Sequence, residues 1–237
     1  MYLSSVPGRS LALALTFALG LTVAGCSSGS SGPEDTDPDF GTNDPAVVVG
    51  LGDSITFGLF DAGVVTCDEQ FRATAGFCPR LARLTSKIVI NEGVCGETSQ
   101  DGAARVAGVL QRWKPGVLLI DYSPNDLFVG TDAVIDNLRL MISAARENKT
   151  VPVIGTLVPA VGAHQGWEPF VEGLNARIRA LCRQEGIEYA DHWQAFTDNP
   201  GFASDPYTLL SEDGLHPNAA GYQLMAKTWR WPLLRVY

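Results

Sequence analysis

The stretch that decides the fold is VVVGLGDSITFG, residues 47–58. A β-branched apolar run is followed directly by Gly52, Asp53 and Ser54, and this order is typical of a buried strand that turns into a helix. Ser54 is therefore a candidate nucleophile at that turn. An ordinary polar turn uses the same residue types, so the stretch by itself leaves both interpretations open.

Strand and helix patterns alternate along the rest of the chain. Short apolar runs predict strands over residues 47–51, 88–91, 117–122, 151–157 and 187–190. Amphipathic patterns predict helices over residues 71–86, 99–113, 132–149, 168–185 and 218–230. Strict alternation, with strands that are apolar on both faces, predicts an α/β fold: a flavodoxin-like doubly wound sheet of five parallel strands with helices on both faces. We expect residues 45–237 to form one domain.

The N-terminal segment has the features of an export signal. Arg9 precedes an apolar run over residues 11–23, which has the length of a secretory h-region. The run closes on LTVAGC, residues 21–26, which resembles a bacterial lipobox. The resemblance implies that residues 1–25 are a lipoprotein signal peptide and that Cys26 is lipidated. An ordinary signal peptide, with an incidental Cys26, is the alternative.

Residues 26–44 are rich in Asp, Gly, Ser and Pro, and this composition predicts a linker. The whole chain has a net charge of −9; without the five acids of the linker and Arg9, 21 acids and 16 bases remain, a net charge of −5. This mild acidity argues against nucleic acid as a partner. We expect an exported protein, held by lipid on Cys26 at the extracytoplasmic side of a membrane, at the cell surface or in the periplasm.

Four cysteines follow Cys26, and export makes disulfides permissible. Four cysteines allow three full pairings. Cys67 and Cys78 lie in one polar stretch and would close a short loop, so they form a possible disulfide. The alternative is that all four, including Cys95, are buried thiols, and Cys182, inside a helical pattern, is expected to be one.

Polar residues and glycines gather where the predicted strands end. The second strand ends in NEGVCGET, residues 91–98, and the third in DYSPND, residues 121–126. Ligands of doubly wound sheets bind outside the carboxyl ends of the strands. DGLHP, residues 213–217, precedes the last predicted helix. In such a turn Asp213 can hold the Nδ1 proton of His216, which leaves Nε2 facing a nucleophile.

Four blocks in this order carry a family resemblance. They are GDSIT at 52–56, NEGVCGETS at 91–99, SPND at 123–126 and DGLHPN at 213–218. With them the chain resembles the SGNH hydrolases of the GDSL esterase/lipase family, over residues 46–230. Together the blocks imply the SGNH hydrolase fold and a catalytic domain over the body of the chain.

The resemblance also implies a role for each matching residue. Ser54 is the implied nucleophile, His216 the base and Asp213 the residue that orients His216. The implied oxyanion hole combines the backbone N–H groups of Ser54 and Gly96 with the side-chain amide of Asn125. The implied reaction is hydrolysis of carboxylic esters through an acyl-serine intermediate, without metal or cofactor.

The chain departs from the family pattern at Ser123, where the family has glycine. Pro124 follows and restricts Ser123 to extended geometry, so we expect the loop that carries Asn125 to have a different shape. Thr56 takes the place of the second glycine in Gly-x-Ser-x-Gly, which argues against an ordinary α/β-hydrolase. No Cys/His cluster has zinc spacing, and no phosphate-binding loop with a lysine follows a strand.

Other polar residues receive structural interpretations. We expect His164 and His192 to be loop histidines, either solvated or hydrogen-bonded. Asp53 and Asp126 are expected to bind backbone groups and hold turns, as Asp does at helix starts.

The substrate is expected to be a small-molecule, glycan or lipid ester. The segment 59–79 is a candidate wall of the site, with Phe60, Phe71 and Phe77 available to line it; a place in the core is the alternative, favoured for Phe71. Two other functions fit the same residues. One is acyl transfer to a sugar or alcohol, and the other is a catalytically silent, surface-anchored binding protein on the same scaffold.

Overall fold

The computed structural model describes residues 38–122 and 124–237. These residues fall within one compact unit. The predicted signal peptide, Cys26 and most of the predicted linker lie outside the described residues, and so does Ser123.

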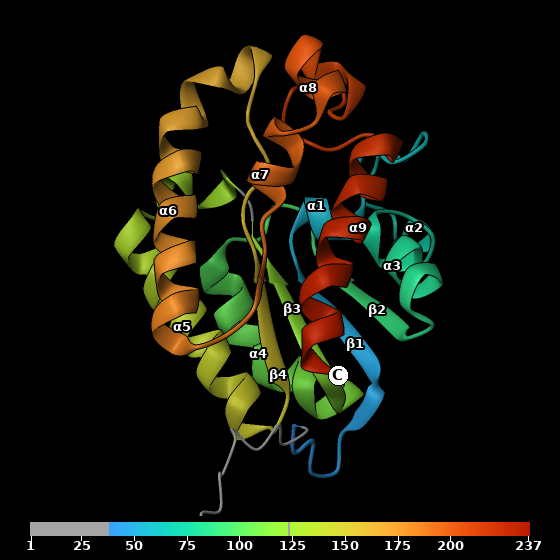
Figure 1. The fold of residues 1–237 in the computed structure, drawn as a ribbon, viewed down its shortest axis with the longest axis vertical. Helices are drawn as coiled ribbons and strands as arrows, with labels where there is room; N and C mark the ends of the chain where they lie inside the picture. The colour runs from blue at the N-terminus through green and yellow to red at the C-terminus, as the bar shows by residue number, and fades with distance from the viewer. Residues whose placement is uncertain (1–37, 123) are drawn as a thin grey trace, which may run out of the picture. The chain divides into compact units, whose positions relative to one another are not determined.

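Five parallel strands form the sheet at the centre of the molecule (Figure 1). They are β1 (Asp44–Gly52), β2 (Ile88–Gly93), β3 (Pro115–Asp121), β4 (Val151–Gly155) and β5 (Tyr189–Ala190). Their order is β2-β1-β3-β4-β5, and every neighbouring pair is parallel. Every residue of β3 is buried, as its apolar sequence requires for a central strand covered on both faces. The predicted doubly wound fold is confirmed, although β5 keeps only two residues of its predicted length.

Helices cover both faces of this sheet. One apolar core lies between the sheet and α4 (Ser99–Trp113), α5 (Thr131–Glu147) and α6 (Glu168–Glu185). The other lies between the sheet and α3 (Phe77–Thr85), α7 (His192–Thr197) and α9 (Ala219–Val236). In Figure 1, α9 crosses in front of the sheet and α4 lies behind it. The bounds of α4 and α6 are those predicted, and α9 continues past its predicted end at Arg230.

Short elements carry the connections at the carboxyl ends of the strands. They are α1 (Ser54–Phe57), α2 (Glu69–Arg72), α8 (Pro200–Ser204), and the 3-10 turns η1 (Pro124–Phe128), η2 (Gly162–Trp167) and η3 (Pro206–Thr208). No helix within the described ranges is long and apolar enough to cross a membrane.

The predicted single helix over residues 71–86 is wrong. Two helices, α2 and α3, replace it, and Gly76 lies between them with a φ of +76°. A Cβ atom on Gly76 would lie 2.9 Å from the Cα atom of Gly58. The break therefore comes from a close backbone approach and a left-handed conformation that favour glycine.

Candidate active site

Ser54 stands at the point where β1 turns into α1. Asp53 caps α1, and its Oδ1 accepts a hydrogen bond of 2.9 Å from the backbone N–H of Ile55. Gly52 packs so closely on β3 that a Cβ atom would overlap the carbonyl oxygen of Asp121. The Gly-Asp-Ser order thus has local causes: close strand packing, a helix cap and an exit from the sheet. Asp53 holds the turn as predicted.

The structure brings Ser54, His216 and Asp213 into one row. Ser54 Oγ lies 2.8 Å from His216 Nε2, and His216 Nδ1 lies 2.6 Å from Asp213 Oδ2. The other carboxylate oxygen of Asp213 accepts hydrogen bonds from the hydroxyl of Ser211 at 2.6 Å and from the N–H groups of Leu215 at 2.9 Å and His216 at 3.0 Å. Asp213 is therefore fixed on both sides.

The hydrogen bonds to Asp213 also determine its charge. Burial favours the neutral acid, but the hydrogen bonds from His216, Ser211 and the backbone outweigh burial and hold the pKa of Asp213 well below its usual range. The carboxylate is ionised at neutral pH. A charged acceptor beside Nδ1 orients the ring of His216 with Nε2 toward Ser54.

Gly96 and Asn125 follow β2 and β3, the two strands that flank β1 in the sheet. Gly96 follows β2 with a φ of +80°, and a Cβ atom there would meet nothing within 4 Å among the described residues. The side-chain amide of Asn125, on η1, donates a hydrogen bond of 3.0 Å to the carbonyl of Glu97. This bond joins η1 to the turn after β2 that contains Gly96 and Glu97, which we call the glycine turn.

Asp126 anchors the same turn to α4. Its carboxylate accepts hydrogen bonds from the N–H of Ser99 at 2.9 Å and from the hydroxyl of Ser99 at 2.8 Å. Asp126 is buried, and burial raises its pKa. The predicted structural role of Asp126 is confirmed.

The predicted disulfide between Cys67 and Cys78 is wrong. Cys67 is bonded to Cys95, with Cα atoms 6.3 Å apart. Cys78 lies on α3 with its Sγ against Gly50 of β1, is 1 % exposed, and remains a free thiol. Proximity in sequence misled the prediction, because α3 turns Cys78 inward while Cys67 stays on the loop beside the glycine turn. Cys182 is a buried free thiol as predicted.

The other two histidines differ from each other. His164 Nδ1 lies 2.8 Å from the carbonyl oxygen of Asp213, so it is a hydrogen-bonded loop histidine as predicted. The prediction for His192 is wrong: it begins α7, is fully buried, and its ring packs against Trp229 with ring centroids 4.9 Å apart. Neither ring nitrogen of His192 has a hydrogen-bond partner within the described residues. Burial lowers its pKa to about 3.

The candidate wall residues separate into site and core. Phe60 packs against the turn that carries His216, with its ring centroid 5.3 Å from that of the imidazole. Phe77 is fully buried in the core between the sheet and α9. Phe71 packs on a small apolar cluster that includes Phe57 and Val64. Phe60 is thus the aromatic residue of this set that contacts the site.

Arg105, on α4, was not predicted as a site residue from the sequence, but its hydrogen bonds support the glycine turn. Its guanidinium donates to the carboxylate of Glu97 at 2.7 Å and to the carbonyl of Glu92 at 2.7 Å. It also reaches the carbonyl of Gly52 at 3.3 Å. Arg105 therefore ties the ends of β1 and β2 to the turn that carries Gly96. In the sequence, Arg105 is marked only as a basic residue within the amphipathic pattern of α4.

A buried serine hydroxyl, an imidazole and a carboxylate in contact in that order, at the carboxyl edge of a doubly wound sheet, form the arrangement that serine hydrolases use. Within residues 38–122 and 124–237, no three His, Cys, Asp or Glu side chains come together as a metal site would require. The class that this site defines is that of the serine hydrolases.

The family follows from comparison with known proteins. A model of the GDSL-like Lipase/Acylhydrolase family matches residues 51–224, so the chain belongs to this family and is a hydrolase. A multidomain esterase from Ruminococcus flavefaciens is 27% identical over 136 residues, which are 56% of this chain and 17% of that protein. The chain thus spans about a sixth of that relative's length.

Solved structures share the fold at low identity. The lipase/acylhydrolase from Enterococcus faecalis is 23% identical with a TM-score of 0.65, over 78% of this chain and 93% of that one. An acetyl xylan esterase from Geobacillus stearothermophilus is 16% identical with a TM-score of 0.66, over 81% of this chain and 95% of that one. At these identities the likeness establishes the fold.

Proposed function

We propose that the protein is a serine esterase that hydrolyses carboxylic esters through an acyl-Ser54 intermediate. Ser54 Oγ attacks the ester carbonyl carbon while Nε2 of His216 takes the hydroxyl proton. The tetrahedral intermediate collapses, the C–O bond to the alcohol breaks, and His216 returns the proton to the departing alcohol. Water then attacks the acyl-serine with the same base, which releases the carboxylic acid and restores Ser54.

The observation that carries this proposal is the row of contacts from Ser54 to His216 to Asp213, at 2.8 and 2.6 Å. Serine is a weak nucleophile without a base, and the ionised carboxylate of Asp213 stabilises the imidazolium that forms when His216 takes the proton. These three side chains supply every proton movement that the reaction requires.

We propose that the developing oxyanion is bound by the backbone N–H groups of Ser54 and Gly96 and by the side-chain amide of Asn125. The left-handed conformation of Gly96 and the hydrogen bond from Asn125 to Glu97 support this assignment, because both fix the loop in advance of the reaction. Fixed donors cost no reorganisation as charge develops, which is why such groups accelerate acyl transfer.

A fluorophosphonate probe, which phosphonylates activated serines, tests the proposal. The wild-type protein should be labelled and should release p-nitrophenol from p-nitrophenyl acetate. Ser54→Ala should abolish both signals, whereas Ser204→Ala, at an exposed serine of α8, should retain both. Labelling that survives in Ser54→Ala would refute the assignment. Product analysis with an added sugar or alcohol would distinguish hydrolysis from acyl transfer.

We also propose export and a lipid anchor at Cys26. The lipobox-like sequence at residues 21–26 supports the anchor. The disulfide between Cys67 and Cys95 supports export, because disulfides persist mainly in oxidising compartments. In a bacterial host fed a labelled fatty acid, the wild-type protein should incorporate label and fractionate with membranes. Cys26→Ala should lose the label, and retention of label would refute the anchor.

A further inference from the structure

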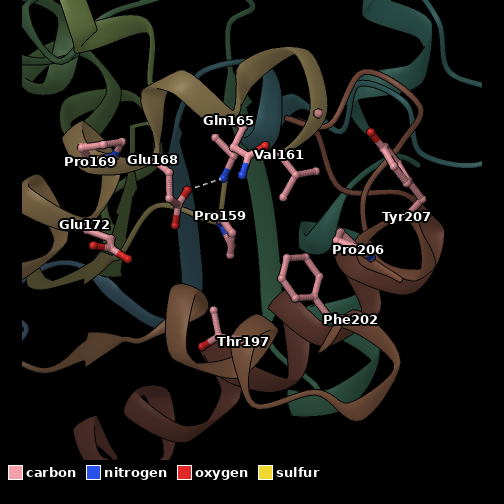
Figure 2. Close-up of a pocket in the computed structure, with 12 residues that line it drawn as sticks. Pro159, Val161, Gln165, Glu168, Pro169, Glu172, Thr197, Phe202, Pro206 and Tyr207 are labelled. Atoms are coloured by element: carbon pink, nitrogen blue, oxygen red, sulfur yellow. Dashed lines mark hydrogen bonds between the residues drawn. The ribbon is translucent and has the colours of Figure 1, made fainter. Parts of the chain in front are cut away.

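A second feature at the carboxyl edge of the sheet is a cavity of about 780 Å³. Its floor is the loop that follows β4, residues 159–162, and its sides come from η2 and the start of α6 on one side and from α7, α8 and η3 on the other (Figure 2). The volume lies within the range of about 300 to 1,000 Å³ that is usual for ligand sites. Ligands of doubly wound folds bind at this edge.

The cavity shares a wall with the turn that carries Asp213. The backbone N–H of Val161 donates a hydrogen bond of 2.8 Å to the carbonyl of Gly214, and His164 contacts the carbonyl of Asp213. Tyr207 closes the same corner, where a Cβ atom on Gly162 would overlap its hydroxyl. A single backbone segment, the loop after β4, therefore separates an occupant of the cavity from the turn that carries Asp213 and His216.

The two sides of the cavity differ in chemistry (Figure 2). One side presents the polar side chains of Gln165, Glu168 and Glu172, and the other presents the rings of Phe202, Pro206 and Tyr207. No lysine or arginine is among the described residues that line it. A site with two carboxylates and no cation repels phosphates and carboxylates, so an anionic ligand is disfavoured.

The carboxylates differ in what they are free to bind. Glu168 is engaged, because it accepts hydrogen bonds from the N–H of Ala160 at 2.7 Å and from the indole of Trp193 at 2.8 Å. Glu172 is exposed and accepts no hydrogen bond from any described residue. Tyr207 is 45 % exposed and presents an open ring. Glu172 can thus accept hydrogen bonds from hydroxyl groups, while Tyr207 can cover an apolar ring face.

From these observations we infer that the cavity binds the uncharged sugar chain of an acylated glycan. A sugar ring has hydroxyl groups along its edge and C–H groups on its face, which match Glu172 and Tyr207 respectively. The inference rests on the proposed esterase function and specifies its substrate: the acyl group at Ser54 would come from an ester on a neutral polysaccharide.

Two assays test the inference, with acetylated xylo-oligosaccharides and p-nitrophenyl acetate as the substrates. The ratio of kcat/KM for the oligosaccharide to kcat/KM for p-nitrophenyl acetate should fall roughly 10-fold in Glu172→Ala, the effect of one lost hydrogen bond to a charged group, and by a similar factor in Tyr207→Ala, the effect of a lost ring contact. Trp231→Ala, at an exposed aromatic residue of α9, should leave the ratio unchanged. If the ratio in Tyr207→Ala and Glu172→Ala is as unchanged as in the Trp231→Ala control, the inference is overturned.

Binding can be measured without turnover. In the Ser54→Ala protein, calorimetric titration with unesterified xylo-, manno- and cello-oligosaccharides should show saturable binding of at least one, lost when Tyr207→Ala is added. Galacturonate oligosaccharides should not bind. Absence of binding by all three neutral sugars, or equal binding of the acidic one, would overturn the inference. Failure of the esterase proposal would appear separately, as absent probe labelling of the wild-type protein.

Discussion

Ser54 Oγ lies 2.8 Å from Nε2 of His216, although 162 positions separate the two residues in the chain. The contact depends on the turn before α9, in which the N–H of Ser211 donates a hydrogen bond of 2.8 Å to the carbonyl of His216. Asp213 organises the inside of that turn with both of its oxygens. The alignment of the serine and the imidazole should therefore be most sensitive to Asp213.

Asp213→Asn should lower kcat for p-nitrophenyl acetate by about 10³-fold or more, because the amide no longer holds the required tautomer of His216 or stabilises its charged form. Ser211→Ala serves as the matched variant. It removes one of several hydrogen bonds to Asp213 and should cost less than about 10-fold. Equal losses of kcat in the two variants would show that activity depends on the shape of the turn and not on the charge of the Asp213 carboxylate.

Asn125→Ala should lower kcat by about 100-fold or more, the usual effect of losing one oxyanion donor. The Michaelis constant should change little, because the lost interaction forms as charge develops on the carbonyl oxygen. Steady-state kinetics with p-nitrophenyl acetate measure both quantities. A raised Michaelis constant with kcat preserved would instead assign Asn125 to ground-state binding.

The disulfide between Cys67 and Cys95 should stabilise the fold. It closes a loop with a sequence separation of 28 residues, and the chain-entropy model gives about 3 to 4 kcal/mol for a loop of that size. Cys67→Ser should therefore lower Tm by roughly 10 °C in a thermal denaturation experiment.

Peptide mapping tests the pairing directly. Without reductant, mass spectrometry should find one cross-linked peptide that contains Cys67 and Cys95. Cys78 and Cys182 should react with iodoacetamide only after the protein has been unfolded, because both thiols are buried in the folded state. Burial also raises the pKa of the Cys182 thiol to about 12 and so suppresses its thiolate. A cross-link between Cys67 and Cys78 would contradict the structure.

Asp121 should make stability depend on pH. Burial, reinforced by the nearby charge of Asp53, raises the pKa of Asp121 to about 8, whereas an unfolded Asp titrates near about 4. Between these values the unfolded chain gives up a proton that the folded protein keeps. Asp121 therefore lowers the free energy of unfolding as pH rises through this window, by at most about 1.4 kcal/mol per pH unit.

Asp121→Asn should remove this slope, because the amide cannot ionise and can still present its oxygen to the hydroxyl of Thr56, which lies 3.2 Å from Oδ2. Urea denaturation between pH 6.5 and pH 9 measures the effect, because a histidine in an unfolded chain titrates near about 6.5 and contributes mainly below that pH. Asp136→Asn, at a carboxylate 73% exposed on α5, should keep the slope of the wild-type protein. If Asp121→Asn also keeps that slope, the buried carboxyl is not its source.

His192 should produce a slope of opposite sign at lower pH. Its pKa is lowered to about 3 in the folded protein, against about 6.5 in an unfolded chain. As pH falls from 6.5 toward 3, the unfolded chain binds a proton that the folded protein does not, so stability is lost. Below about pH 6.5 this contribution opposes that of Asp121, so in urea denaturation between pH 4 and pH 7 the free energy of unfolding of His192→Leu should fall more steeply with rising pH than that of the wild-type protein. His164→Leu, at a partly exposed ring, is the control and should keep the slope of the wild-type protein.

Local patterns predicted much of the fold. The helices α4 and α6 have their predicted bounds, because amphipathic periodicity and clear end signals act within one segment. The break at Gly76 was not predictable in this way, because its cause is Gly58, a residue of another loop. His192 was misjudged for a similar reason: its position after a strand indicated a loop, while Trp229 of α9 covers it in the folded chain.

The sequence by itself determined the alternation of strands and helices and the four polar blocks at the strand exits, since both are properties of neighbouring residues. The tertiary structure decided which groups meet: Cys67 with Cys95, Phe60 with His216, and the loop after β4 with the turn of Asp213. These contacts join segments far apart in the chain. They depend on how the crossovers arrange the carboxyl edge of the sheet, which no local pattern of residues encodes.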